Sequence, residues 1–138
     1  MEIKRINEQV SVSGQIAPED VPALKAAGFT TIINNRPDAE APEQPAGGDI
    51  EAAAKAAGLA YHHIPLGREG VSADMVEKTR AVFDQSGGAV LAYCRSGTRS
   101  TTLWALSQAG KATAAQIISA AANAGYDISH LAGHLGEE

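Results

Sequence analysis

The amino-acid sequence predicts an α/β domain in which helices flank a central, largely parallel sheet of about four to five strands. Short apolar or β-branched segments alternate along the chain with segments of helical length, which is the order of elements typical of a parallel sheet. Hydrophobic residues make up 44% of the 138 residues and charged residues 20%, so the chain can bury a sizeable core. We find no internal repeat and no linker, and we expect residues 1–138 to form a single domain.

The first half of the chain is predicted to hold three strands, two helices and one long loop. The strands are alternating or β-branched runs between turn residues, and they cover residues 10–13, 29–33 and 59–66. A helix is expected from Pro18 to Ala27, because proline fits a first helical turn and a glycine follows. Asp49 is expected to cap a helix over residues 50–57. Residues 34–48 hold three of the six prolines and form a long loop, a kind of segment that is usually functional or mobile.

The second half is predicted to hold one strand among helices. Ser72 fits the N-cap of a helix over residues 73–85, and the apolar run 89–93 follows it as a buried strand. A further helix is expected over residues 100–109. Thr113 and Gln116 have the spacing of a capping box for a helix that ends near residue 123. Asp127 is expected to cap a last short helix.

Cys94 stands at the carboxyl end of the predicted strand 89–93, where ligands gather in open α/β sheets. The next residues turn into a helix, so backbone N–H groups and the helix dipole can face an anion. Gly97 permits the close approach of such amides, and Arg99 can bind an oxyanion with a bidentate fork. A cysteine in this setting ionises more readily than free cysteine, so we expect a thiolate nucleophile at neutral pH. The plainer interpretation is a buried structural cysteine.

The predicted site has three groups of residues. The candidate catalytic residues are Cys94, Arg99 and Ser100. The rest of the anion-binding loop consists of Arg95, Ser96, Gly97 and Thr98. The pocket rim is expected to hold Arg36, Arg68 and Glu69, although an arginine in the position of Arg36 more often pairs with a loop carboxylate such as Asp38 or Glu40. Arg95 is expected to face solvent and guide anions inward.

Residues 90–100, Val-Leu-Ala-Tyr-Cys-Arg-Ser-Gly-Thr-Arg-Ser, resemble the phosphate-binding loop of cysteine-dependent protein tyrosine and dual-specificity phosphatases. The signature of those enzymes is His-Cys, five residues, then Arg followed by Ser or Thr. Here Tyr93 replaces the histidine, and four residues separate Cys94 from Arg99. This shorter loop is similar instead to the active loop of rhodaneses, Cys-x-x-Gly-x-Arg, which carry sulfane sulfur as a cysteine persulfide.

Three upstream segments also look phosphatase-like: Val-Ser-Gly-Gln at 12–15, Thr-Ile-Ile-Asn-Asn-Arg-Pro at 31–37 and Tyr-His-His-Ile-Pro-Leu at 61–66. Over nearly the whole chain the sequence resembles the beta-lactamase-hydrolase-like family of phosphatase-fold domains. The resemblance implies a protein tyrosine phosphatase-like fold. Members of that family also occur joined to persulfide dioxygenases as sulfurtransferase domains, so a persulfide dioxygenase is an expected partner.

Two chemistries fit this loop, and the sequence favours sulfur transfer. In that reaction the Cys94 thiolate takes one sulfur atom from thiosulfate or a low-molecular-weight persulfide and passes it to a thiol acceptor such as glutathione. The departing sulfite is already a stable anion, so no general acid is needed, and a six-residue loop suits a single sulfur atom. We therefore expect a rhodanese-type sulfurtransferase that forms a Cys94 persulfide.

A phosphatase that acts through a Cys94 phosphocysteine is the alternative. Such an enzyme needs a wider loop and a general acid that protonates the leaving group. Glu69 is the candidate acid and Asp74 a weaker one, although carboxylates in such positions are more often solvated or helix-capping. Ser100 favours this alternative, since the resemblance implies that the hydroxyl after arginine assists breakdown of the phosphocysteine. The same hydroxyl would serve equally well to cap or steady the start of the helix. A non-catalytic anion-binding module is the third alternative.

Charge and composition argue against several other classes of function. The formal net charge is −5. Proteins that bind the nucleic-acid backbone usually have a basic surface, so this charge argues against that function. The single cysteine excludes an internal disulfide, and we expect neither a metal nor another cofactor. The pair His62 and His63 and the pair His130 and His134 lack further ligands. With no apolar run of membrane-spanning length, we expect a cytoplasmic protein with a small anionic substrate.

Overall fold

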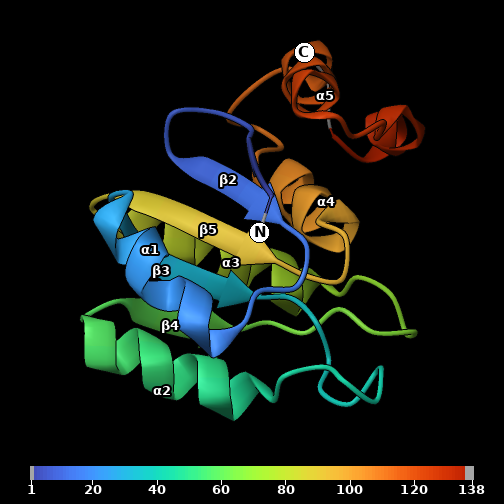
Figure 1. The fold of residues 1–138 in the computed structure, drawn as a ribbon. Helices are drawn as coiled ribbons and strands as arrows, with labels where there is room; N and C mark the ends of the chain where they lie inside the picture. Colours follow the sequence, from blue (N-terminus) through green and yellow to red (C-terminus); the bar gives the residue numbers. More distant parts are fainter. Residues whose placement is uncertain (1, 136–138) are drawn as a thin grey trace.

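The computed structural model describes residues 2–135 and confirms the α/β fold, which is built around one five-stranded sheet (Figure 1). The order of the strands across the sheet is β1-β2-β5-β3-β4. Their bounds are Ile3–Arg5 for β1, Val10–Ser13 for β2, Phe29–Asn34 for β3, Ala60–His63 for β4 and Ala89–Tyr93 for β5. β1 pairs antiparallel with β2, and the other neighbours pair in parallel. The largely parallel sheet is therefore as the sequence predicts, with β1 added at one edge.

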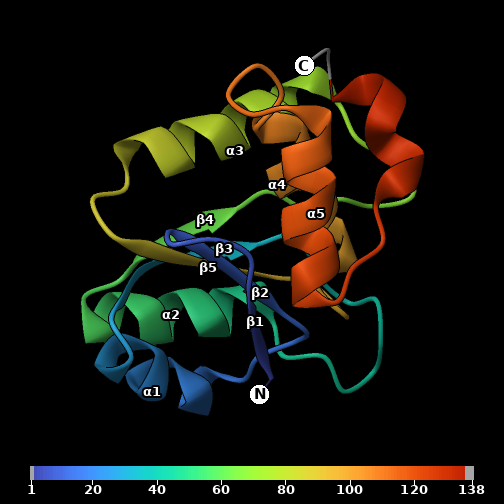
Figure 2. The ribbon, with the colours of Figure 1, turned by 90° about the horizontal axis from the view of Figure 1, so that it is seen from above.

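Helices cover both faces of this sheet, as the view from above shows (Figure 2). On one side lie α1 (Val21–Ala26), preceded by the 3₁₀ turn η1 (Pro18–Asp20), and α2 (Gly47–Ala57). On the other side lie α3 (Ala73–Gln85), α4 (Thr98–Ser107) and α5 (Ala114–Ala124), and the 3₁₀ segment η2 (Ser129–His134) follows α5. The sheet thus separates two apolar layers.

The central strand β5 contributes to both layers because its side chains alternate between the faces of the sheet. Leu91 and Tyr93 pack with the cluster under α1 and α2, whereas Val90 and Ala92 pack with the cluster under α3, α4 and α5. All four side chains are buried. Burial on both faces explains why this strand reads as a continuous apolar run in the sequence.

Two helix caps lie where the sequence predicts them. Ser72 accepts a hydrogen bond from the Met75 amide at 3.2 Å, and Thr113 forms the capping box with Gln116. Ser129, at the start of η2, donates to Asp127 through both its amide and its hydroxyl. These local contacts satisfy amides that have no partner inside a helix.

The predicted cap at Asp49 is wrong. α2 begins at Gly47, and the Gly47 amide donates to the side chain of Asp38 at 2.7 Å. A carboxylate from the preceding loop therefore caps the helix, while Asp49 lies in its first turn. The reason is a contact between elements far apart in the sequence. A Cβ at Gly47 would lie 3.0 Å from the side-chain nitrogen of Asn34, so the start of α2 is packed against the end of β3.

Two other predicted elements differ in length. β4 ends at His63 rather than at Leu66, although the Ile64 and Leu66 amides still donate to the carbonyls of Asn34 and Asn35. α4 begins at Thr98, two residues before the predicted start, so its first turn directly follows the cysteine loop. Within residues 2–135, no helix has the length and apolar character needed to cross a membrane.

Candidate active site

Cys94 follows β5 and lies where three parallel strands end. Its amide donates to the Ser13 carbonyl of β2, and the Asn35 amide after β3 donates to the Tyr93 carbonyl at 2.8 Å. The cysteine sulfur accepts a hydrogen bond from the Gly97 amide, with 3.1 Å between the two atoms. The sulfur thus faces the N-terminal end of α4, the arrangement that favours a negative charge.

Gly97 is the N-cap of α4 and has a φ of +93°, a conformation that side chains rarely adopt. Its carbonyl accepts from the amide and the hydroxyl of Thr101. A Cβ at this position would lie 2.2 Å from the Tyr126 hydroxyl. Glycine is therefore required here by both backbone conformation and space.

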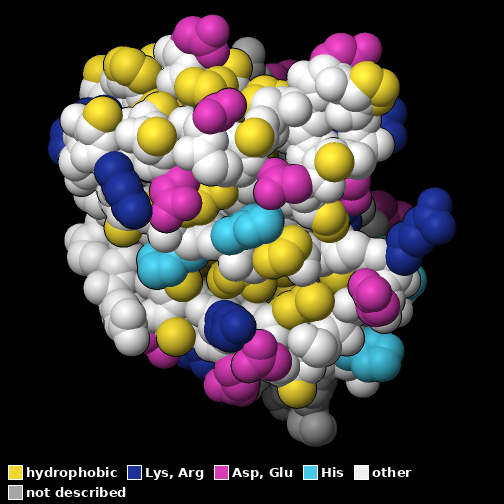
Figure 3. Space-filling view, turned by 90° about the horizontal axis from the view of Figure 1, so that it is seen from below, with side chains coloured by type: hydrophobic (Ala, Val, Ile, Leu, Met, Phe, Trp, Pro, Cys, Tyr) yellow, Lys and Arg dark blue, Asp and Glu magenta, His cyan; other side chains and the backbone are white. Residues whose placement is uncertain are grey.

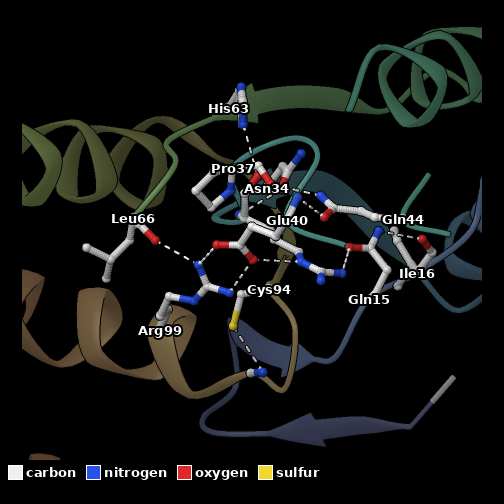
Figure 4. Close-up of polar contacts among 12 residues, drawn as sticks. Gln15, Ile16, Asn34, Pro37, Glu40, Gln44, His63, Leu66, Cys94 and Arg99 are labelled. Carbon is white, nitrogen blue, oxygen red and sulfur yellow. Dashed lines mark hydrogen bonds and ion pairs between the residues drawn. The ribbon is translucent and has the colours of Figure 1, made fainter. Parts of the chain in front are cut away.

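Arg99 points from α4 toward the loop that follows β3 (Figure 4). Its two terminal nitrogens bind the two carboxylate oxygens of Glu40, each at 2.8 Å. One of these nitrogens also donates to the Leu66 carbonyl at 2.8 Å. The predicted bidentate fork is present, and in this structure a carboxylate of the chain itself fills it.

Arg36 holds the same carboxylate from the other side. Its Nε atom binds Glu40 at 2.9 Å, and a terminal nitrogen donates to the side-chain oxygen of Gln15 at 3.0 Å. The Arg36 side chain is 5% exposed. The predicted pairing of Arg36 with a loop carboxylate is thus observed, and through Glu40 this buried arginine is joined to Arg99.

The two guanidinium groups keep Glu40 ionised. Hydrogen bonding to Arg99, helped by Arg36, lowers the pKa of Glu40 from its ordinary 4.5 to about 2, against the opposing effect of burial. The partnership with Glu40 and the proximity of Cys94 raise the pKa of Arg99. Glu40 in this position cannot act as a proton donor near neutral pH.

The cysteine is closed off in this arrangement. Cys94 has no exposed surface, and the Arg99 side chain is 26% exposed. An anion that binds the same two terminal nitrogens of Arg99 has to displace the Glu40 carboxylate from them.

A cavity of about 440 Å³ lies beside the Arg99–Glu40 pair. Its lining consists of Pro37, Glu40, Pro65, Gly67, Arg68 and Glu69. Arg68 and Glu69 are exposed and line this cavity together with Glu40, and their role as a pocket rim stays a prediction. Asp74 lies elsewhere, in the first turn of α3, where it pairs with Lys78 at 3.1 Å.

Ser100 lies in the first turn of α4 and is buried. Among residues 2–135 its hydroxyl has no hydrogen-bond partner, and the same holds for the hydroxyl of Tyr93. Tyr93, which replaces the histidine of the phosphatase signature, packs in the cluster under α1 and α2. Burial raises the pKa of Tyr93, so its phenol stays neutral.

The other loop residues face outward. Arg95 is exposed, as expected, and its carbonyl accepts from the Gln15 amide at 3.4 Å. Ser96 and Thr98 are exposed and their hydroxyls lie 3.2 Å apart. These three side chains are turned to solvent, and the Gly97 amide is the hydrogen-bond donor that contacts the sulfur.

Tyr126, which follows α5, is a site residue that the sequence did not indicate. Its hydroxyl donates to the Ser96 carbonyl at 2.9 Å. Burial, and then the negative charges of Cys94 and Glu2, raise the pKa of Tyr126. The hydroxyl therefore keeps its proton and remains a donor at neutral pH.

The histidines do not form a metal site in the part of the chain that the structure describes. No group of three His, Cys, Asp or Glu side chains in residues 2–135 could hold a metal ion. The His63 ring instead contacts the Arg36 carbonyl at 3.2 Å. On the face shown in Figure 3, acidic and basic side chains are interspersed with apolar ones.

Comparison of the sequence with known proteins gives a consistent result. Residues 2–111 match the family model described as "Beta-lactamase hydrolase-like protein, phosphatase-like domain". Beta-lactamase hydrolase-like proteins from Agrobacterium fabrum and from Xylella fastidiosa strain Temecula1 are 38% and 41% identical over 109 residues. The matches take in 79% and 78% of this chain and 25% of each relative, so the chain spans about a quarter of the length of these curated relatives.

Solved structures agree with the family match. A provisionally assigned phosphatase from Neisseria meningitidis has a TM-score of 0.84 and 33% identity, and the match covers 98% of this chain and 96% of that one. The structure of PTPMT1 has a TM-score of 0.74 at 16% identity, covering 97% and 91% of the two chains. The second likeness concerns the fold alone. The protein tyrosine phosphatase-like fold that the sequence predicts is confirmed.

Proposed function

This chain belongs to the family of phosphatase-like domains of the beta-lactamase hydrolase-like proteins, and on that premise we propose that it is a cysteine-dependent phosphatase. The observation that carries the proposal is the bidentate grip of Arg99 on two oxygens of one anion, each at 2.8 Å. A phosphate monoester presents two oxygens in the same way. Sulfur transfer, which the short loop and the lack of need for a general acid favour in the sequence, receives no support from the comparisons.

Binding begins with an exchange of anions at Arg99. The substrate phosphate takes the place of the Glu40 carboxylate, and the freed loop exposes Cys94. The amide of Gly97 and the N-terminal end of α4 then face a sulfur and a phosphoryl group that both carry negative charge. A phosphate monoester carries a charge of about −1.5 to −2 near neutral pH, more than the single negative charge of the carboxylate, so Arg99 attracts it more strongly.

The chemistry follows in two steps. The Cys94 thiolate attacks phosphorus, the bond to the ester oxygen breaks, and Glu69 gives a proton to the leaving alkoxide. Water then attacks the phosphocysteine, Glu69 takes a proton from it, and inorganic phosphate leaves as the thiolate is restored. Glu69 is assigned this role because it lines the cavity beside Arg99, whereas Asp74 lies in the first turn of α3 paired with Lys78.

Ser100 completes the proposed set. Its hydroxyl is buried one residue after Arg99 and has no partner among the described residues. A donor of this kind can stabilise the thiolate when it leaves phosphorus in the second step. Loss of this hydroxyl should slow breakdown of the phosphocysteine more than its formation.

The six-residue spacing from Cys94 to Arg99 still favours sulfur transfer as a second candidate. A single sulfur atom needs less room than a phosphoryl group. Thiosulfate would place its sulfonate oxygens on Arg99 and its outer sulfur at Cys94, and the persulfide would pass to a thiol such as glutathione. A persulfide dioxygenase, joined or separate, is then the proposed partner.

The two candidates are separated by parallel assays on one preparation. Release of inorganic phosphate from an aryl phosphate is measured beside sulfur transfer from thiosulfate to glutathione, for the wild type, Cys94→Ser and Arg99→Lys. We expect vanadate-sensitive phosphate release that Cys94→Ser abolishes and Arg99→Lys lowers by about 100-fold. Sulfur transfer without phosphate release, lost in the same two variants, would reverse the ranking.

A further inference from the structure

The peptide unit between Ser96 and Gly97 is held at both ends. Its N–H, which belongs to Gly97, donates to the Cys94 sulfur at 3.1 Å. Its carbonyl, which belongs to Ser96, accepts from the Tyr126 hydroxyl at 2.9 Å. Because the peptide unit is planar, the two ends turn together.

We propose that Tyr126 is a positioning residue that locks this peptide with its N–H toward the nucleophile. If the unit rotated by half a turn, its carbonyl oxygen would face the sulfur and repel a thiolate. The Tyr126 hydroxyl opposes that rotation because a rotated peptide would present no carbonyl to it. The inference rests on the proposed role of Cys94 as a thiolate nucleophile.

The backbone at this point needs such a lock. Gly97 has no side chain, so rotation about its φ angle is less restricted than at any other residue type. Its φ of +93° is one of several conformations open to glycine. The Tyr126 ring lies directly over the glycine, where a Cβ would approach its Cζ atom to 3.0 Å. Contact and hydrogen bond together hold one of these conformations.

This contact joins the site to a segment outside the matched family region. Tyr126 follows α5, whereas the family model ends at residue 111. α5 itself is anchored by Ile117 and Ala121, which are buried in the cluster that also contains Trp104 of α4. The C-terminal helical segment thus has a defined task in the site, which is to place one hydroxyl.

The charges around Cys94 are few, so the effect of one hydroxyl should be measurable. Arg99 of α4 faces the sulfur, and Glu40 reaches it only through that arginine. Glu2, just before β1, acts on Tyr126 itself, and Lys4 of β1 lines the same hollow as Tyr126 and Ser96. Removal of the hydroxyl leaves all of these charges unchanged, and only the orientation of the peptide responds.

The test compares Tyr126→Phe with Tyr61→Phe as the matched control. Tyr61→Phe also removes one hydroxyl contact, the hydrogen bond that the Tyr61 hydroxyl accepts from the side-chain nitrogen of Asn34 at 3.0 Å. That contact lies outside the cysteine loop. The rate of Cys94 alkylation by iodoacetamide is measured against pH. We expect the midpoint of the profile to rise by about one pH unit in Tyr126→Phe and to stay unchanged in Tyr61→Phe. An unchanged midpoint in a folded Tyr126→Phe would overturn the inference.

A second pair of variants covers the case in which Tyr126→Phe does not fold. Replacement of Tyr126 by para-aminophenylalanine keeps a donor on the ring, and replacement by para-fluorophenylalanine keeps the size without a donor. The midpoint should stay near the wild-type value in the first and rise in the second. Equal midpoints in the two variants would overturn the inference. If the wild type itself titrates like free cysteine, the proposed thiolate chemistry fails, which is a separate outcome.

Discussion

Glu40 and Arg99 are 59 positions apart in the sequence, yet two pairs of their atoms lie 2.8 Å apart in front of the cysteine sulfur. The Arg99 fork that a substrate anion needs is occupied by a carboxylate of the same chain. Arg36 holds that carboxylate from behind, so two cations share one anion. Under the proposed function, Glu40 therefore competes with the substrate anion for Arg99.

Glu40→Gln should bind phosphate and vanadate more tightly. The amide cannot offer Arg99 two charged oxygens, so a competing anion is lost and the apparent dissociation constant should fall by roughly 2- to 10-fold. Isothermal titration with vanadate measures the change. Glu43→Gln, an exposed neighbour in the same loop, is the control. Weaker binding in Glu40→Gln would mean that the carboxylate supports Arg99 rather than competes with its ligand.

Acid should weaken the fold partly through Glu40. Its pKa is about 2 in the folded protein and 4.5 ordinarily, so the unfolded chain binds a proton more readily. The stabilisation is present above about pH 4.5 and is lost as the pH falls toward 2. Urea midpoints at about pH 6 and about pH 3 should therefore differ more in the wild type than in Glu40→Gln. Equal acid sensitivity in the two proteins would exclude this contribution.

Gly97→Ala should destabilise the protein less when Tyr126 is already phenylalanine. In the wild type the new Cβ meets the tyrosine hydroxyl at 2.2 Å, whereas without that oxygen the nearest ring atom is at 3.0 Å. The positive φ costs the same in both backgrounds. A double-mutant cycle of urea unfolding should give a coupling free energy of about 0.5–3 kcal/mol. Additive effects would show that the two residues do not meet.

Glu69→Gln should slow hydrolysis in a way that depends on the leaving group. An alkyl phosphate needs a proton donor, so its rate should fall by about 10²- to 10⁴-fold, while an activated aryl phosphate should react nearly as before. Asp74→Asn removes a carboxylate that is engaged with Lys78 and is the matched control. The same loss for both substrates would remove Glu69 from the role of acid.

The elements that could be predicted from the sequence are those fixed by local contacts. Thr113 and Gln116 cap each other within one turn, and the buried strand at 89–93 is apolar throughout. β1 has only three residues, and its register against β2 is set by pairing across the sheet, which no local pattern records. The prediction that Asp49 caps α2 was wrong for the same reason, because the cap comes from Asp38 in the preceding loop.

The same distinction between local and long-range contacts holds for the residues of the candidate site. Cys94, Gly97 and Arg99 lie within six residues, so the loop that they share could be predicted from the sequence. Glu40 reaches Arg99 only because β3 and β5 are neighbours, and Tyr126 reaches Ser96 only because α5 packs against α4. These two contacts bring together residues 59 and 30 positions apart, and no periodicity predicts them.

The most direct test of the account is to identify what Cys94 carries during turnover. The protein is mixed with an aryl phosphate, and separately with thiosulfate, quenched in acid within one turnover and weighed intact. We expect the mass of one phosphoryl group on Cys94 after the aryl phosphate, absent in Cys94→Ser and accumulating in Ser100→Ala. A chain that gains one sulfur atom from thiosulfate and never a phosphoryl group would contradict it.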